Sequence, residues 1–138
     1  HRWEFRHNHI GFNYRMPNIN AALGCAQLEN LDKYIASKRK VAAEYIEFFK
    51  NVDGIDFFVE PENTFSNYWL SAVVLKDKES QLDFLQQTND NGVMTRPIWE
   101  LMNRLPMFEN CENDGLVNTI WFADRVVNIP SSVRIEGI

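Results

Sequence analysis

Residues 67–76 of this chain predict a strand at the centre of a sheet. The interior of the stretch, Tyr68 to Leu75, is almost entirely apolar and rich in residues that favour β-structure. A strand with apolar side chains on both of its faces is normally covered on both faces. We therefore expect a central strand, with Trp69 in the hydrophobic core rather than serving as a stacking platform for a ligand.

Shorter patterns around this strand predict the rest of a small domain. Further strands are expected at residues 55–59, after a turn at Asp53-Gly54, and at 93–95 and 126–129. The strand at 93–95 is expected to pair with the central strand. Helices are expected at residues 79–91, with Leu82 and Leu85 facing inward, and at 116–125. Together these elements predict an α+β domain with a small, mainly antiparallel sheet of about three strands and helices on one face.

A helical pattern runs from Pro17 to about Asn51, and its apolar residues repeat with a period near 3.6. Residues 30–32 are the natural place for a kink or a break, because Asn and Asp side chains compete for backbone hydrogen bonds. The basic run 38–40 is expected to form a solvated helix face balanced by Glu44 and Glu47 rather than a polyanion site. The small residues at 21, 22, 24 and 26 suit tight helix packing or a subunit contact.

Residues 11–18, Gly-Phe-Asn-Tyr-Arg-Met-Pro-Asn, form a loop that leads into this helix. Asn13 offers an amide, and Arg15 offers a guanidinium fork suited to phosphate or carboxylate. Pro17 and Asn18 are expected to open the helix, Pro at a first-turn position and Asn as the cap, and such an end attracts anions. The sequence therefore predicts a ligand-holding loop, with an ordinary helix entry as the other interpretation.

A second candidate site is Arg96-Pro97-Ile98-Trp99. Pro97 restricts Arg96 to an extended conformation and removes a hydrogen-bond donor, so the chain is expected to leave the sheet here. This would present Arg96 and Trp99 at the edge of the sheet. The other interpretation makes Trp99 a hydrophobic plug and Arg96 a surface residue.

Composition narrows the classes of function. The 138 residues carry a net charge of −5, which argues against a nucleic-acid surface. His7 and His9 share the spacing of one strand face, but no carboxylate or cysteine stands at a usual zinc-site spacing, so no metal is expected. No apolar run reaches the roughly 20 residues of a membrane span, so we expect a cytoplasmic protein with no membrane partner. Cys25 and Cys111 are expected to be reduced.

The run from Gly11 to Arg15, followed by Ala21-Ala22-Leu23-Gly24 and Ala26-Gln27-Leu28, resembles the signature of the DegT-type nucleotide-sugar aminotransferases. These are fold-type I enzymes that use pyridoxal 5'-phosphate (PLP). The stretches Asn67 to Leu70 and Gly92 to Trp99 are similar to the subgroup that aminates UDP-linked keto-sugars, of the legionaminic-acid type.

The resemblance implies a homodimeric enzyme that takes a nucleotide-sugar substrate and an amino-acid donor, with glutamate expected. This chain would be its small C-terminal domain, residues 17–138, preceded by a connector and cofactor-proximal loop at 1–16. Asn13 is then expected to bind the cofactor phosphate of the other subunit, and family members often have an aromatic near Trp99 that borders the cofactor pocket. Arg96 and Trp99 are expected to bind substrate, and Arg15 a sugar-nucleotide phosphate or the cofactor side. Several family members have a histidine shortly after the position of Trp99 that helps to hold the donor carboxylate. This chain has Asn103 there, so that role does not carry over.

The sequence offers no catalytic residue of its own. Amino transfer through PLP needs a lysine imine to the cofactor, and Lys33, Lys38 and Lys40 lie on a charged helix face without desolvation. The chain begins at His1 with no initiator methionine, and we expect it to be an inactive segment of a longer enzyme. Two alternatives stay open: a PLP-dependent sugar dehydratase of the same family, and a stand-alone binding or dimerisation module.

Overall fold

The computed structural model describes residues 12–134 of the chain. Gly11, His1, His7 and His9 lie outside the described residues, and so do the expectations that involve them. The chain divides into two compact units, His1–Asp32 and Lys33–Ile138. We describe each unit by itself.

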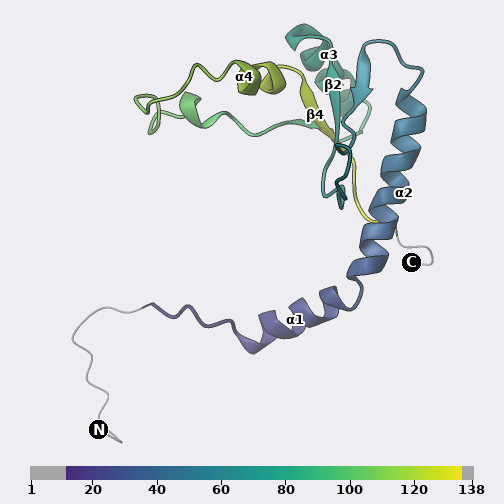
Figure 1. The fold of residues 1–138 in the computed structure, drawn as a ribbon, viewed down its shortest axis with the longest axis vertical. Helices are drawn as coiled ribbons and strands as arrows, with labels where there is room; N and C mark the ends of the chain where they lie inside the picture. Colours follow the sequence, from purple (N-terminus) through teal and green to yellow (C-terminus); the bar gives the residue numbers. More distant parts are fainter. Residues whose placement is uncertain (1–11, 135–138) are drawn as a thin grey trace, which may run out of the picture. The chain divides into compact units, whose positions relative to one another are not determined.

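The elements follow one another in a helix-rich first part and a mixed second part (Figure 1). Their order is α1 (Asn18–Leu28), α2 (Leu31–Phe49), β1 (Ile55–Phe57), β2 (Ser71–Leu75), α3 (Lys78–Asp90), β3 (Arg96–Pro97), the 3-10 helix η1 (Met102–Arg104), α4 (Val117–Ala123) and β4 (Val126–Ile129).

The predicted break in the long helical pattern is confirmed, since α1 ends at Leu28 and α2 begins at Leu31. Asn30 Nδ2 donates to the Ala26 carbonyl at 3.0 Å, which is the side-chain competition expected of an Asn at this point. The expected cap is wrong in detail. Pro17 occupies the N-cap of α1, Asn18 is already helical, and no side chain caps this end. None of the residues of α1 is buried within its unit.

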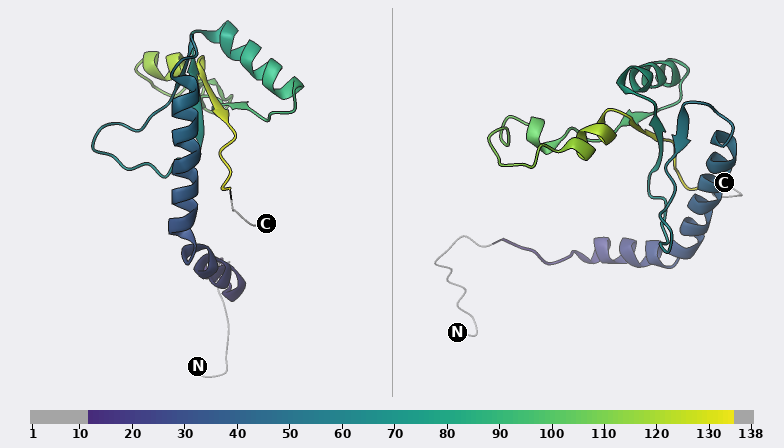
Figure 2. Two further views of the ribbon diagram at one scale, coloured as in Figure 1. Left: turned by 90° about the vertical axis from the view of Figure 1, so that its right-hand side faces the viewer. Right: turned by 45° about the horizontal axis from the view of Figure 1, so that its top comes forward.

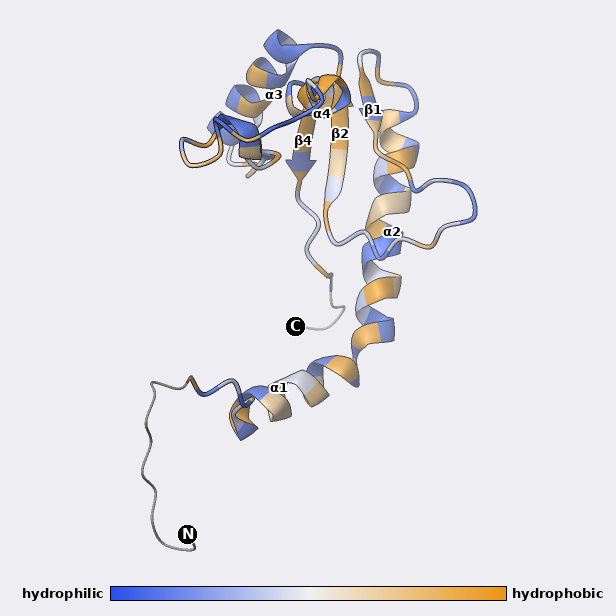
Figure 3. Ribbon diagram, turned by 60° about the vertical axis from the view of Figure 1, so that its left-hand side comes forward, coloured by the Kyte–Doolittle hydropathy of each residue, from blue (hydrophilic) through white to orange (hydrophobic). Residues whose placement is uncertain are grey.

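The second unit is built on an antiparallel sheet with the strand order β1-β2-β4-β3. Val73 of β2 pairs with Phe57 on one side and Val127 on the other. Because directly paired residues point to the same face, these three side chains form one apolar face, and Val73 and Val127 are fully buried. Figure 3 shows hydrophobic residues along β1, β2 and most of β4. The small antiparallel α+β fold predicted from the sequence is confirmed.

Helices α2 and α3 both cover this face of the sheet. α2 supplies Ala42, Tyr45 and Phe49, and α3 supplies Phe84 and Leu85. The ring of Tyr45 stacks on that of Phe57 with centroids 5.9 Å apart. After β4 the chain runs beside α2 (Figure 2), where the Tyr45 hydroxyl donates to the Pro130 carbonyl at 2.9 Å.

Strand β2 differs from its prediction in two respects. It spans only Ser71–Leu75, and its residues alternate between buried and half-buried. One face is therefore fully covered and the other only partly, so cover on both faces is less complete than expected, while the position of β2 inside the sheet is as expected. The buried side of α3 also differs, because Leu82 is 54% exposed while Gln81 is fully buried.

The short strand expected at residues 93–95 is also wrong. Side chains of α3 hold Thr95: Thr88 Oγ1 and Thr95 Oγ1 lie 2.6 Å apart, and Asn89 Nδ2 donates to the Thr95 carbonyl at 3.1 Å. The ladder begins one residue later, at Arg96–Pro97, and pairs with β4 rather than with the central strand β2. The edge strand therefore forms where these side-chain contacts end.

Candidate functional site

The backbone turns sharply just before β2, and this turn exposes Trp69. Tyr68 has a φ of 46°, in the left-handed region that a bulky residue rarely adopts. Ser66 Oγ accepts from the Tyr68 N–H and Asn67 Oδ1 accepts from the Trp69 N–H, at 3.0 and 2.9 Å. The ring of Tyr68 enters the core, while Trp69 remains 66% exposed. The prediction that Trp69 belongs to the core is therefore wrong, because the strand does not extend through this turn.

Trp99 lies close to Trp69 but follows the edge strand β3. Pro97 is the last residue of β3, so the chain leaves the ladder there, as its missing N–H predicts. Trp99 follows two residues later and is 71% exposed. The indole rings of Trp69 and Trp99 lie 6.4 Å apart between centroids, with an angle of 31° between their planes.

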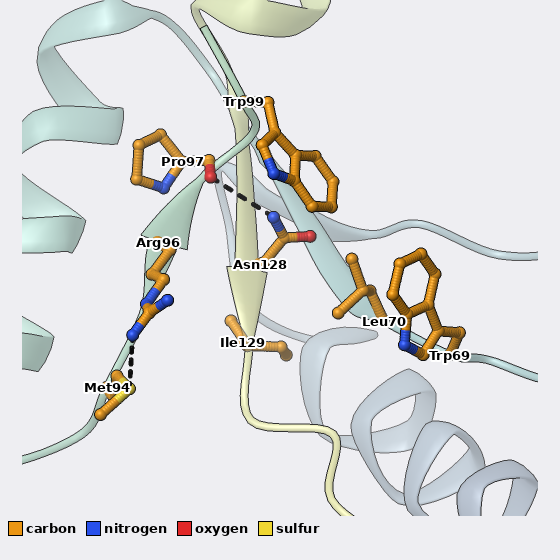
Figure 4. A pocket seen from close by; sticks show the side chains of 8 residues that line it. All are labelled: Trp69, Leu70, Met94, Arg96, Pro97, Trp99, Asn128 and Ile129. Atoms are coloured by element: carbon orange, nitrogen blue, oxygen red, sulfur yellow. Dashed lines mark hydrogen bonds between the residues drawn. The ribbon is translucent and has the colours of Figure 1, made fainter. Parts of the chain in front are cut away.

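The two indoles line a pocket of about 480 Å³ (Figure 4). Its lining residues are Trp69, Leu70, Met94, Arg96, Pro97, Trp99, Asn128 and Ile129. Arg96 and Asn128 are register partners, so both side chains belong to the sheet face opposite α2 and α3. In Figure 4 the indoles lie on one side of β4, and Arg96 and Met94 on the other. The pocket thus combines two aromatic surfaces with one guanidinium and one amide.

The polar groups of this pocket have weak partners within the chain. Arg96 Nη2 lies 3.4 Å from the sulfur of Met94, and among the described residues Arg96 forms no ion pair. Asn128 Nδ2 donates to the Pro97 carbonyl at a long 3.4 Å. A guanidinium without a carboxylate partner can bind phosphate or carboxylate in a bidentate manner. The prediction that Arg96 and Trp99 lie at a sheet edge is confirmed by their positions, and their binding role stays a prediction.

Lys38 of α2 binds the backbone of two segments next to this pocket, a role that the sequence did not indicate. Its Nζ donates to the Trp69 carbonyl at 3.1 Å and to the Ser131 carbonyl at 2.6 Å. The adjacent Arg39 forms a bidentate ion pair with Glu60. Lys38 and Arg39 therefore make tertiary contacts, and the expectation of a purely solvated basic face is wrong for both.

The loop before α1 belongs to the first unit and is exposed throughout. Asn13 Oδ1 accepts from the backbone N–H of Arg15 at 3.1 Å and from its Nε at 3.4 Å. Because the carbonyl end of the Asn13 amide is engaged in this way, its NH₂ end is the part left to act as a donor. Phe12 and Tyr14 flank these two residues in an open depression. The geometry is compatible with anion binding by Asn13 and Arg15, which stays a prediction.

Asn103 lies in η1 and lines a separate depression of about 230 Å³ together with Phe108 and Cys111. Its Oδ1 atom is buried and has no hydrogen-bond partner among the described residues. This oxygen acceptor lies in the region where several family members have a histidine. An amide there could accept from a donor group but could not change its charge with pH as a histidine does.

The described part of the chain shows no cluster of His, Cys, Asp and Glu that could hold a metal ion. Cys25 and Cys111 are exposed and form no disulfide with each other in the described residues. None of the helices in residues 12–134 is long and apolar enough to cross a membrane.

Comparison with known proteins gives the same assignment over nearly the whole chain. Residues 1–137 match the DegT/DnrJ/EryC1/StrS aminotransferase family. GDP-perosamine synthase from Escherichia coli O157:H7 is 32% identical over 130 residues, covering 93% of this chain and 34% of the relative. The chain therefore spans about a third of the length of the curated relatives it matches.

Two solved structures show that the fold is shared. The aminotransferase TlmJ from Streptoalloteichus hindustanus matches with a TM-score of 0.84 and 20% identity, over 98% of this chain and 36% of that one. E. coli GDP-4-keto-6-deoxy-D-mannose-3-dehydratase, solved with bound hydrated PLP, matches with a TM-score of 0.69 and 19% identity, over 95% of this chain and 34% of that one. The match along residues 1–137, together with the α+β fold, shows that this chain belongs to the DegT/DnrJ/EryC1/StrS aminotransferase family.

Proposed function

We propose that this chain is the C-terminal part of a PLP-dependent enzyme that transfers an amino group from an amino acid, glutamate in the first instance, to a nucleotide-linked keto-sugar. The observation that carries the proposal is the family match over residues 1–137, which includes both candidate sites. A relative named for the synthesis of a GDP-linked amino sugar supports the substrate class. Biosynthesis of a cell-surface polysaccharide or glycan in the cytoplasm is the setting that we propose for it.

The pocket suits one part of such a substrate. A nucleotide sugar has a planar base, a diphosphate and a pyranose ring whose C–H face is apolar. Indoles bind bases or sugar faces by stacking, and a guanidinium binds phosphate oxygens. We assign Trp69, Trp99 and Arg96 to substrate binding, and Arg15 to a substrate phosphate. Their task is to hold and orient the sugar, since none of them can relay a proton at neutral pH.

The residues of the first unit fit a role at the phosphate of PLP. Asn13 has its carbonyl turned toward Arg15, which leaves the amide NH₂ to donate to a phosphate oxygen. When bound, PLP supplies the electron sink that amino transfer needs. No lysine of the described residues suits the cofactor bond, because Lys38 is held by two carbonyl groups and Lys33, Lys40, Lys50, Lys76 and Lys78 are exposed. We place that lysine in another part of the enzyme.

The amination assay tests this function on the full-length enzyme. Keto-sugars linked to GDP, dTDP or UDP are supplied with nitrogen-15-labelled glutamate and PLP, and the sugar product is analysed by mass spectrometry. We expect label in the sugar with at least one nucleotide and none with this 138-residue chain alone. A product that has lost oxygen without gaining nitrogen would identify the second candidate, a sugar dehydratase, whose fold this chain also shares. Turnover by the chain alone would contradict the proposed division of the active site.

In the same assay, Trp99→Ala and Arg96→Ala should each raise KM by roughly tenfold, the size expected for one lost stacking or charge-assisted contact. Arg104→Ala is the matched control, since Arg104 is exposed and pairs with Glu100, four residues earlier. Unchanged KM in both pocket variants would remove this pocket from the substrate site.

A further inference from the structure

We infer that Lys38 is a positioning residue for the substrate pocket, because its ammonium group holds the two backbone segments that carry Trp69 and Ile129. The inference rests on the proposed function of the pocket. It concerns a residue outside the pocket lining, whose ammonium group donates to main-chain oxygens.

The strand ladder does not extend to the segment that carries Trp69. The ladder between β2 and β4 ends at the pair formed by Ser71 and Ile129. The next residue on the β4 side is Pro130, which has no N–H to donate. On the β2 side the chain turns away through Tyr68, with its φ of 46°. Trp69 thus lies beyond the last strand pair, next to a residue in a strained conformation.

Lys38 links the two backbone segments at residues 69 and 131. Its Nζ lies 3.1 Å from the Trp69 carbonyl and 2.6 Å from the Ser131 carbonyl. Ser131 Oγ also donates to the Trp69 carbonyl, at 3.2 Å. One ammonium and one hydroxyl therefore join residues 69 and 131, which the ladder no longer pairs. Hydrogen bonds from a charged donor are the stronger kind, and the ammonium has three N–H groups to share between carbonyl groups.

Both segments that Lys38 links contain or adjoin residues that line the pocket. Trp69 carries one of the two indoles, and its neighbour Leu70 is also in the lining. Ile129 lines the pocket two residues before Ser131. α2 anchors the bridge, since Val41 and Ala42, one turn further along, are fully buried. Lys38 thereby sets the position of the Trp69 segment relative to the buried part of α2.

The test compares Lys38→Met with Lys38→Arg in the full-length enzyme. Met keeps an unbranched side chain as far as the ε position and removes the donor, whereas Arg retains donors that can reach the same carbonyl groups. We expect Lys38→Met to raise KM about tenfold with little change in kcat, and Lys38→Arg to recover most of the loss. Lys33→Met, at an exposed lysine of the same helix, is the control and should leave KM unchanged.

A double variant separates positioning from general damage. If Lys38 acts through Trp69, adding Lys38→Met to Trp69→Ala should change KM by less than about twofold. A further rise as large as in the wild-type background would overturn the inference. Trp69→Ala without any effect on KM would instead contradict the proposed role of the pocket.

Fluorine NMR of the enzyme labelled with 5-fluorotryptophan gives a readout that does not depend on activity. Lys38→Met should shift or broaden the Trp69 and Trp99 signals, assigned with Trp→Phe variants, and leave the signal of Trp121 in α4 in place. An unmoved Trp69 signal would overturn the positioning role, whatever the kinetics show.

Discussion

At the scale of single residues, a bidentate ion pair joins Arg39 of α2 to Glu60 in the loop after β1. Arg39 Nη1 and Nη2 donate to the two Glu60 oxygens at 3.0 and 2.7 Å. The same Nη1 donates to the Ser66 carbonyl at 2.6 Å, and the guanidinium lies 4.1 Å from the ring centroid of Phe65. This cluster closes the loop that ends at the exposed Trp69. Planar stacking and a bidentate fork are properties of Arg that Lys lacks, so the two are not interchangeable here.

The charge of Glu60 makes this contact dependent on pH. The hydrogen bond from Arg39, followed by the one from the Ser66 backbone N–H, lowers the pKa of Glu60 from 4.5 to about 2. A carboxyl with a depressed pKa in the folded state stabilises the fold above its unfolded pKa, and this contribution is lost as pH falls toward the folded value. The stability that Glu60 contributes should therefore be complete above about pH 4.5 and decline between there and about pH 2.

Glu60→Gln tests this dependence. The variant should lower Tm at pH 7, and the difference from wild type should shrink as pH is lowered from about 4.5 toward 2. Thermal melts in a pH series measure the difference. Glu62→Gln is the control, because Glu62 is exposed in the same loop. A difference that stays constant down to pH 2 would show that the Glu60 charge does not contribute to stability.

At the scale of elements, a buried amide joins α3 to the end of α4 and the start of β4. Gln81 is fully buried, and its Nε2 donates to the Ala123 carbonyl at 3.0 Å and to the Val126 carbonyl at 2.8 Å. Its Oε1 accepts from Lys78 Nζ at 2.8 Å. These contacts use both N–H groups and the oxygen of the amide, so the polar group is satisfied despite its burial. The short connection between α4 and β4 is thereby fixed against α3.

Gln81→Leu should destabilise the protein by about 2–4 kcal/mol, because two buried carbonyl groups would lose their donor. Urea unfolding of the variant and of wild type measures the difference. Gln87→Leu, at an exposed position of the same helix, should change the free energy of unfolding by less than about 0.5 kcal/mol. Equal stability of Gln81→Leu and wild type would mean that water replaces the amide at these carbonyl groups.

Local signals in the sequence predicted most elements, and contacts between distant residues account for the differences. The helices and the strands at residues 71–75 and 126–129 follow from periodicity and β-propensity. Nothing local shows that Arg96 pairs with Asn128, that Gln81 turns inward, or that Tyr68 takes a left-handed conformation. The sequence alone therefore predicts a core position for Trp69. The sequence does predict Arg96 and Trp99 as candidate site residues, because Pro97 is a local signal for the end of a strand. The sequence does not predict the role of Lys38, because its two acceptor carbonyl groups lie 31 and 93 residues away along the chain.

At the scale of the whole molecule, two sets of candidate residues lie in separate units of this chain. Asn13 and Arg15 belong to the first unit, and Arg96 and Trp99 to the second. Amino transfer through PLP also needs a lysine bonded to the cofactor, and none of the lysines in residues 12–134 suits that bond. We propose that the enzyme is a homodimer in which the loop of one subunit contributes to the cofactor site of the other, because a loop at a two-fold interface can contribute to two sites by symmetry.

Asn13→Ala should weaken cofactor binding by roughly 10- to 150-fold, the range for one hydrogen bond to an anion. Whether Asn13 acts across the interface is tested by mixing two full-length variants, Asn13→Ala and a variant that lacks the lysine bonded to the cofactor, at a PLP concentration low enough that each variant alone is inactive. If Asn13 acts across the interface, one site of each mixed dimer carries both lesions and the other carries neither. Random mixing should then restore about a quarter of wild-type activity, since about half of the dimers are mixed and half of their sites are intact. If Asn13 serves the cofactor of its own subunit, every site in the mixed dimer keeps one lesion. Activity should then stay absent after mixing, as it does in each variant incubated alone, and the assignment across the interface would be wrong.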